Sequence, residues 1–222
     1  MINENSNNLQ KLYLAYFGRP ADPSGINYWL NCLNHNFTMR EISHELSRQE
    51  EYKYLAFDKS SEFKINEVHI NLFNRKVDTN LLTYWIKMIE NTGCSISDIV
   101  YDFIFSDTKS IITDLEQKKI DQNVLSYKIL AAETFSKKIG QSILLRNLYQ
   151  PESISPWVNS KSFEKVSDFF CNINLVQVSK ENIDELINSF SDIPIETLTT
   201  PVIELKDISL SIPINYLENR SF

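Results

Sequence analysis

An internal repeat constrains this chain more than any other feature of its sequence. Residues 12–46 and residues 68–103 share a pattern of aromatic, basic and acidic positions that lie 56 residues apart. One extra residue in the second copy moves the spacing to 57 at the end of the pattern. Self-similarity of this kind defines a structural unit that occurs twice. The positions matched at the first spacing are Phe17 and Phe73, Arg19 and Arg75, Asp22 and Asp78, Tyr28 and Tyr84, and Trp29 and Trp85.

Each copy is predicted to form three short helices. Apolar side chains in the first and second helix recur at the spacing of one helical face. Asp22 followed by Pro23 is typical of a helix start, because the carboxylate accepts from free N–H groups and proline loses no hydrogen bond there. Residues 38–41 form a capping box before the third helix, and residues 95–98 are a weaker version of it. We therefore predict an all-α fold built from a tandem repeat of small three-helix units.

The composition agrees with a helical chain. Only four glycines are present among 222 residues, whereas about 7% is usual, so tight hairpins and phosphate-binding loops have few places to form. Beyond the repeats, residues 122–145, 160–171 and 179–190 read as further helices, and the segment after Pro194 reads as extended. The predicted organisation is a first repeat over 1–60, a second, degenerate repeat over 61–120, a helical cap region over 121–192 and an extended tail, with room for short strands, over 193–222.

The first copy, LYLAYFGRPADPSGINYW, resembles the DUF4214 family, whose members have an aromatic helix, then G-R-x-x-D-x-x-G and Y-W. The second copy has Asn74 and Leu81 where the two glycines of that motif would be. Residues 124–135 also resemble the helix that follows such repeats in cyanobacterial-type surface proteins. The family recurs in secreted bacterial proteins, notably at the amino-terminal end of S-layer and RTX-type proteins.

The resemblance implies a non-enzymatic module that attaches to the cell surface. Its expected partner is an envelope glycolipid or glycan such as lipopolysaccharide, or a surface-layer protein, and its expected location is extracellular. Members of this type leave the cell by type I secretion, and residues 1–10 carry no Sec-type signal. The downstream glycine-rich RTX repeats are absent from this sequence. Whether the chain forms a homo-oligomer is left open.

A second hypothesis is an intracellular protein–protein scaffold, because the helical unit with its R-x-x-D turn also resembles the linker domains of phycobilisomes. Cys32, Cys94 and Cys171 lie far apart and form no C-x-x-C motif. We predict that they are small core residues rather than a disulfide framework. Free cysteines are as compatible with a reducing cytoplasm as with the extracellular location of the first hypothesis.

The candidate binding residues are the polar and aromatic positions of both turns. Aromatic faces stack on sugar rings, while arginine and aspartate supply paired hydrogen bonds. The structural alternative is that the arginine holds the turn, the aspartate caps the next helix and the tryptophan fills the core. The predicted ligand-binding set is Arg19, Asp22, Tyr28, Trp29, Arg75, Asp78, Tyr84 and Trp85.

Charge and motifs disfavour several other functions. The chain has 22 basic and 29 acidic residues, a net charge of −7, whereas a nucleic-acid partner would favour clustered Lys and Arg. No nucleophile elbow, Walker loop or dinucleotide fingerprint is present, so we predict neither enzymatic activity nor a cofactor. No apolar run reaches the length of a transmembrane helix.

Metal binding is not predicted either. His35, His44 and His69 are not spaced as zinc ligands, and no calcium-binding loop motif occurs. We expect His69, which takes the place of Tyr13 in the second copy, to be a partly buried packing residue. The acidic pairs at 50–51 and 184–185 are adjacent in sequence and are predicted to lie on solvated helix faces.

Overall fold

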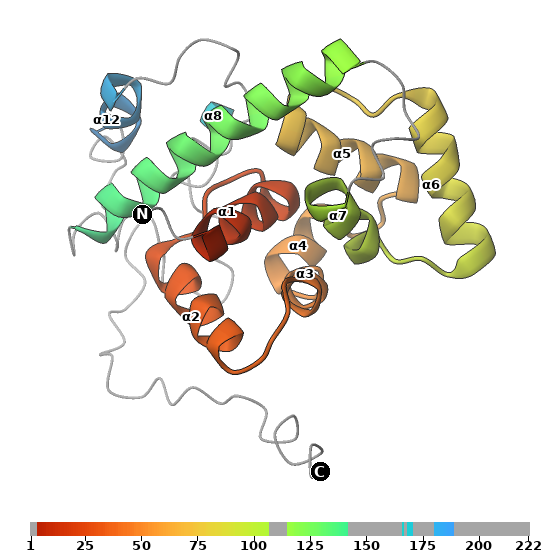
Figure 1. Ribbon diagram of the computed structural model, residues 1–222, viewed down its shortest axis with the longest axis horizontal. Helices are drawn as coiled ribbons and strands as arrows, with labels where there is room; N and C mark the ends of the chain where they lie inside the picture. The colour runs from red at the N-terminus through yellow and green to blue at the C-terminus, as the bar shows by residue number, and fades with distance from the viewer. Residues whose placement is uncertain (1–3, 107–114, 142–165, 167, 171–179, 189–222) are drawn as a thin grey trace.

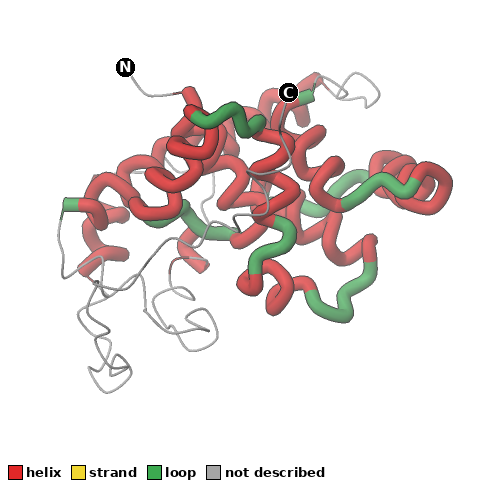
Figure 2. Tube along the Cα trace, turned by 90° about the horizontal axis from the view of Figure 1, so that it is seen from below, coloured by secondary structure: helices red, strands yellow, loops and turns green. Residues whose placement is uncertain are grey.

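The computed structural model describes residues 4–106, 115–141, 166, 168–170 and 180–188. Every regular element in these ranges is a helix, which confirms the predicted all-α character (Figures 1 and 2). The predicted tail over 193–222 and most of the predicted helix over 160–171 lie outside the described residues. The helices are α1 (Glu4–Phe17), α2 (Pro23–Asn34), α3 (Met39–Leu46), α4 (Glu50–Ala56), α5 (Ser61–Phe73), α6 (Thr79–Thr92), α7 (Ile96–Phe105), α8 (Leu115–Gly140) and α12 (Lys180–Asn188).

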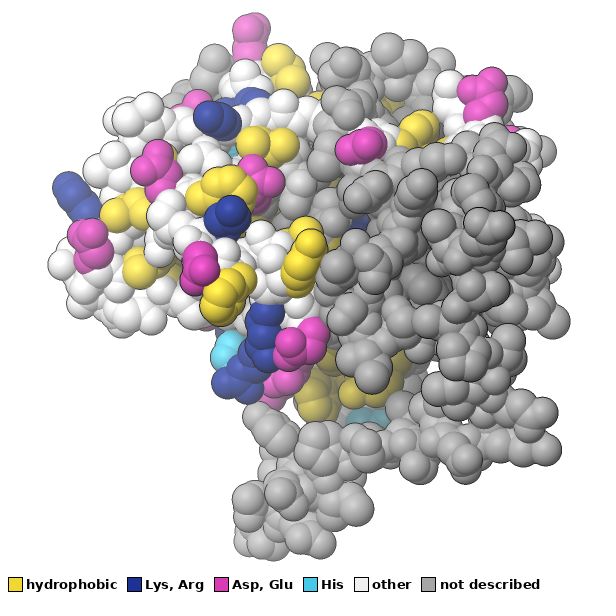
Figure 3. Space-filling model, turned by 180° about the vertical axis from the view of Figure 1, so that it is seen from behind, with side chains coloured by type: hydrophobic (Ala, Val, Ile, Leu, Met, Phe, Trp, Pro, Cys, Tyr) yellow, Lys and Arg dark blue, Asp and Glu magenta, His cyan; other side chains and the backbone are white. Residues whose placement is uncertain are grey.

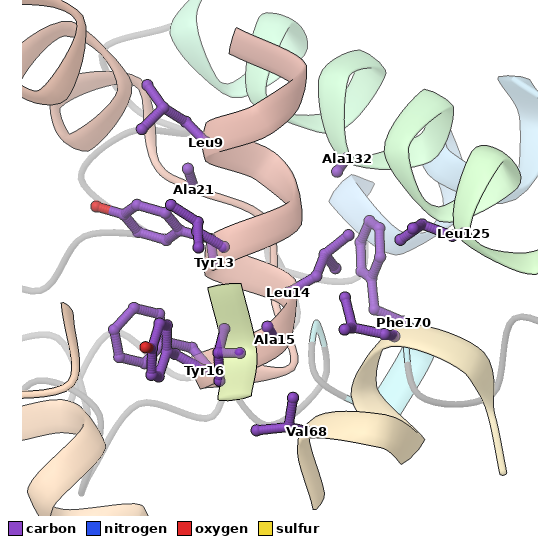
Figure 4. Close-up of a cluster of buried hydrophobic side chains, with 14 of the residues drawn as sticks. Leu9, Tyr13, Leu14, Ala15, Tyr16, Ala21, Val68, Leu125, Ala132 and Phe170 are labelled. Carbon is purple, nitrogen blue, oxygen red and sulfur yellow. The ribbon is translucent and has the colours of Figure 1, made fainter. Parts of the chain in front are cut away.

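Helix α1 lies at the centre of the molecule. From Leu9 to Phe17 every side chain except that of Lys11 is buried, as expected of a helix surrounded by other helices. It packs against α2, α3, α4, α5, α7 and α8. Figure 4 shows Leu14 of α1 facing Leu125 of α8 and Phe170, so the second half of the chain closes over the same core.

The predicted helix starts are present. Asp22 caps α2, accepting a hydrogen bond from the backbone N–H of Gly25 at 2.6 Å. Thr38 and Glu41 form the capping box of α3. Ser95 and Asp98 form an equally complete box at α7, because the aspartate carboxylate still reaches the Ser95 N–H at 3.1 Å. Both hydrogen bonds of the box are therefore present in the second copy, and its return bond is longer than the 2.8 Å bond from the Thr38 N–H to Glu41.

Two elements differ from the predicted pattern. Helix α8 begins at Leu115, seven residues before the predicted start, and residues after 141 fall outside the described part. Helix α4 was not predicted, because its seven residues are too few to show a clear period. The first turn of α4 contains Glu50 and Glu51, and negative charges are favourable at a helix amino terminus.

Several contacts recur at positions 56 residues apart. The side chains of Gln10 and Asn66 each accept a hydrogen bond from a backbone N–H eleven residues later, of Ala21 and Val77, at 2.9 and 3.2 Å. Gly18 and its counterpart Asn74 both have left-handed backbone, with φ of 64° and 59°. Asparagine tolerates this conformation better than most residues, which accounts for one missing glycine. Helix α1 packs on α5 and α3 on α7.

The cysteines are less deeply placed than predicted. Cys32 and Cys94 are half-buried, carry free thiols and pack against the edge of the core rather than inside it. Cys171 lies outside the described residues. No helix in the described part of the chain is long and apolar enough to cross a membrane.

Candidate functional site

The first turn is held by a buried ion pair. Arg19 is 5% exposed, and its Nε and Nη2 atoms donate to the two carboxylate oxygens of Glu51 at 2.7 and 2.5 Å. Nη1 also donates to the Pro20 carbonyl at 3.0 Å. The guanidinium lies over the rings of Tyr13 and Phe17, at 5.7 and 5.4 Å from their centroids. Arg19 therefore joins α1 to α4 and fixes the chain between them.

Glu51 corrects the prediction for the acidic pair at 50–51. Glu50 is solvent-exposed as expected, but Glu51 is only 6% exposed. The Glu51 carboxylate can be buried here because Arg19 donates a hydrogen bond to each of its two oxygens.

The aromatic dipeptide of α2 has one buried and one exposed member. Trp29 is buried, and its Nε1 donates to the Tyr13 hydroxyl at 3.2 Å. Tyr28 is 41% exposed and meets Trp29 edge-on, with ring centroids 4.8 Å apart. Burial raises the pKa of the Tyr13 hydroxyl far above its ordinary value, so this group stays protonated and acts only as a hydrogen-bonding group.

Gly25 makes room for the Tyr13 hydroxyl. A Cβ atom placed on Gly25 would overlap that oxygen. In the second copy the two positions change together, because His69 stands for Tyr13 and Leu81 for Gly25. The shorter histidine side chain leaves space for a side chain at position 81, which accounts for the second missing glycine.

This steric relation predicts a double-mutant result. We expect Gly25→Ala to lower the free energy of unfolding by about 1–3 kcal/mol, since the buried hydroxyl has to shift. In a Tyr13→Phe background the same change is expected to cost clearly less, because the nearest obstructing oxygen is gone, while the Asp22 carboxylate oxygens at 3.1 Å remain. Urea denaturation of the four proteins measures the coupling.

Gly140→Ala is the matched control for that cycle. Among the described residues its Cβ would meet only Pro23 side-chain atoms, the nearest at 3.5 Å, so we expect no destabilisation in either background. A cost of Gly25→Ala that is the same in wild type and in the Tyr13→Phe background would contradict the explanation.

The second turn keeps the arginine but opens it to solvent. Arg75 donates to both carboxylate oxygens of Asp121 on α8, at 2.9 and 2.7 Å. It also donates to Asp78 at 3.1 Å and to the Lys76 carbonyl at 3.2 Å. The Asp121 carboxylate, and to a smaller extent that of Asp78, raises the pKa of Arg75. Asp78 is exposed and, unlike Asp22, makes no side-chain cap bond to its helix.

The aromatic pair of the second copy has the same geometry but different hydrogen bonds. Trp85 is buried and Tyr84 half-buried, with ring centroids 5.0 Å apart. Among the described residues the Trp85 Nε1 has no hydrogen-bond partner, because His69 replaces the tyrosine that serves Trp29. His69 is a packing residue as predicted, but at 3% exposure it is fully rather than partly buried. Its Nδ1 lies 2.8 Å from the Arg75 carbonyl oxygen.

The eight predicted residues thus fall into two groups. As the structural alternative expects, Arg19 is buried and holds its turn, Trp29 and Trp85 are buried in the core, and Asp22 caps its helix. Surface is offered by Tyr28, Asp78 and, in part, Arg75 and Tyr84. The turns bring together an arginine and an aspartate in each copy, with side chains 4.0 Å apart in the first and 3.1 Å in the second.

Sequence reasoning missed an exposed apolar patch at the junction of α4 and α5. In the run of residues 52–57, Tyr52 and Ala56 face inward at helical spacing, so their apolar neighbours cannot. The signal was therefore present, since five of these six residues are apolar. The exposed members of this patch are Tyr54, Leu55, Phe57 and Phe63, with Phe57 71% exposed.

Acidic and basic side chains are interspersed on the part of the face in Figure 3 that the structure describes. Within the described residues no group of three or more His, Cys, Asp or Glu side chains is placed to hold a metal ion. Lys138 and Asp184 form an ion pair between α8 and α12, so one of the acidic residues predicted to be solvated is paired.

Comparisons with protein-family models, with curated proteins and with solved structures find no match to this chain.

Proposed function

We propose that this chain is a non-enzymatic attachment module that docks on an envelope glycolipid or glycan, such as lipopolysaccharide, outside the cell. The observation that carries the proposal is an aromatic pair that occurs twice. In Tyr28–Trp29 and Tyr84–Trp85 a tyrosine that reaches the surface is braced edge-on by a buried tryptophan. A ring held in this way stacks on a ligand at little cost in conformational entropy.

The proposal includes the tandem organisation. On this view α1–α3 and α5–α7 are two helical units of the DUF4214 type, and type I secretion exports the chain. Support comes from the matched contacts of Gln10 and Asn66. In addition, each arginine binds a carboxylate, although the two carboxylates come from different helices. A unit that occurs twice can bind a repetitive surface at two points. The second binding event is then intramolecular, so the overall affinity exceeds that of either contact alone.

The net charge of −7 bears on the kind of ligand. An acidic chain is repelled by lipid phosphates, so the proposed contacts are to sugar rings. Tyr28 and Tyr84 supply the stacking faces, and Arg75 and Asp78 supply hydrogen bonds to hydroxyl groups. Arg19, Asp22, Trp29 and Trp85 support these contacts from within.

Retention on lipopolysaccharide-coated beads and on whole envelopes tests the proposal. Wild type is expected to bind saturably, and Tyr28→Ala/Tyr84→Ala to bind at least about tenfold more weakly. Tyr54→Ala is the matched control, since this tyrosine is 57% exposed but lies outside the turns. No saturable binding at micromolar protein would contradict the attachment function.

One observation favours a second candidate, the intracellular scaffold. The exposed apolar patch of Tyr54, Leu55, Phe57 and Phe63 has the character of a protein–protein contact. If wild type fails to bind envelopes, this patch becomes the first place to look for a protein partner in the cytoplasm.

A further inference from the structure

Helix α2 carries no charged residue along its whole length. Its twelve residues, PSGINYWLNCLN, include no Asp, Glu, Lys, Arg or His, although 23% of the chain is charged. The helix packs against α1 and α8 and lies at the edge of the molecule in Figure 1. Its exposed side chains are Ser24, Asn27, Tyr28, Asn31 and Asn34.

These exposed residues lie on one helical face, because they follow the i, i+3, i+4 and i+7 spacing. Asn31 is the surface neighbour of both Asn27 and Tyr28, at i,i+4 and i,i+3. The side-chain amides of Asn27 and Asn31 make no hydrogen bond within the described part of the chain. Each amide offers two N–H donors and a carbonyl acceptor. The Tyr28 ring beside them is fixed by its edge contact with Trp29.

The corresponding face of α6 provides an internal comparison. Asn27 corresponds to Thr83, Asn31 to Lys87 and Asn34 to Glu90, and all three α6 side chains are exposed. The second copy therefore has charged side chains at two of the three positions where the first has amides. Of the two corresponding helices, only α2 has an uncharged face formed by amide side chains.

We propose that the α2 face, formed by Asn27, Tyr28 and Asn31, binds the neutral sugar residues of an envelope polysaccharide. The tyrosine ring covers the apolar face of a pyranose, and each asparagine amide hydrogen-bonds to its hydroxyl groups. Burying a charged side chain under a ligand costs free energy, because the charge loses its hydration. A neutral hydroxylated ligand avoids this cost on the α2 face, which has no charged side chain. The inference rests on the proposed function and names the ligand class and the helix that recognises it.

The test uses the full chain and two probes: polysaccharide released from lipopolysaccharide and freed of lipid and phosphate, and intact lipopolysaccharide. We expect wild type to bind both, and Asn27→Ala/Asn31→Ala to bind the released polysaccharide about tenfold more weakly or worse. Thr83→Ala/Lys87→Ala, at the corresponding positions of α6, is the matched control and is expected to bind as wild type does. Thermal unfolding verifies that both variants fold, and the side-chain amide NMR signals of wild type are expected to shift on titration.

The outcomes separate this inference from the proposed function. Equal binding of the released polysaccharide by wild type and by the double asparagine variant would overturn the α2 assignment and leave the attachment function standing. Binding to intact lipopolysaccharide alone would overturn the neutral ligand class, again without touching attachment. Binding to neither probe would overturn both.

Discussion

Replacing Arg19 with methionine is expected to lower the free energy of unfolding by about 3–5 kcal/mol. The change leaves the Glu51 carboxylate in a site that is 6% exposed and removes the donors at 2.7 and 2.5 Å that satisfy both of its oxygens. Desolvation of an unpaired carboxylate, rather than the strength of the lost ion pair, dominates this cost. Urea denaturation followed by circular dichroism measures it.

Two further variants make the reason testable. Arg48→Met breaks the exposed pair with Glu45, 3.5 Å long, and is expected to cost less than about 1 kcal/mol. The double variant Arg19→Met/Glu51→Leu is expected to regain most of the lost stability, because apolar side chains of similar size fill the site. A double variant as unstable as Arg19→Met would mean that the arginine matters for something other than Glu51.

The position of Arg19 also decides which variants report on a ligand. An Arg19→Ala protein that no longer binds envelopes would have lost the join between α1 and α4, so its failure would say little about contact with a glycan. Tyr28 is exposed and, within the described part of the chain, makes no bond that fixes a turn. Variants of this tyrosine and of the α2 asparagines therefore separate binding from folding.

The local features of the fold were predictable from the sequence. Asp22 and Thr38 cap their helices through backbone groups within three residues, so short sequence windows contain all the information. The adjacent aromatic residues of Y-W point about 100° apart on a helix, so only one of them can enter the core. The pattern favoured Trp29 as the core residue and did not specify how far Tyr28 would remain exposed.

The partners of the two arginines were not predictable. Glu51 lies 32 residues from Arg19 and Asp121 lies 46 residues from Arg75, and no local rule pairs residues at such separations. In the first copy the acid comes from α4 and in the second from α8, helices that differ in length and sequence. Only the three-dimensional structure shows that Glu51 and Asp121 both pair with the arginine of a turn. The overlap between a Cβ at Gly25 and the Tyr13 hydroxyl is likewise visible only in the structure.

Acid is expected to destabilise this protein through His69. Burial among Phe73, Phe103 and neighbouring helices lowers the pKa of His69 from 6.5 to about 4, and the nearby Arg75 cation acts in the same direction. The hydrogen bond to the Arg75 carbonyl and the Asp121 and Asp78 carboxylates oppose this without overcoming it. The imidazole is therefore neutral in the folded protein at pH values where it is already charged in the unfolded chain.

The direction of the pH effect follows from this difference in proton binding. Between about pH 6.5 and about pH 4 the unfolded state takes up a proton that the folded state does not, so stability falls as the pH falls through this window. The full loss in the free energy of unfolding is on the order of 3 kcal/mol. Above about pH 6.5 this loss does not occur.

Urea denaturation at a series of pH values from about 7.5 to about 4.5 measures this loss. His69→Asn keeps a donor for the Arg75 carbonyl but does not titrate, so its stability is expected to change much less across the window, whatever its value at neutral pH. His44→Asn is the matched control, because His44 is exposed on α3, and its profile is expected to follow wild type. Parallel profiles for wild type and His69→Asn would assign the acid sensitivity to the carboxylates instead, and would mean that the pocket around His69 admits a charged imidazole.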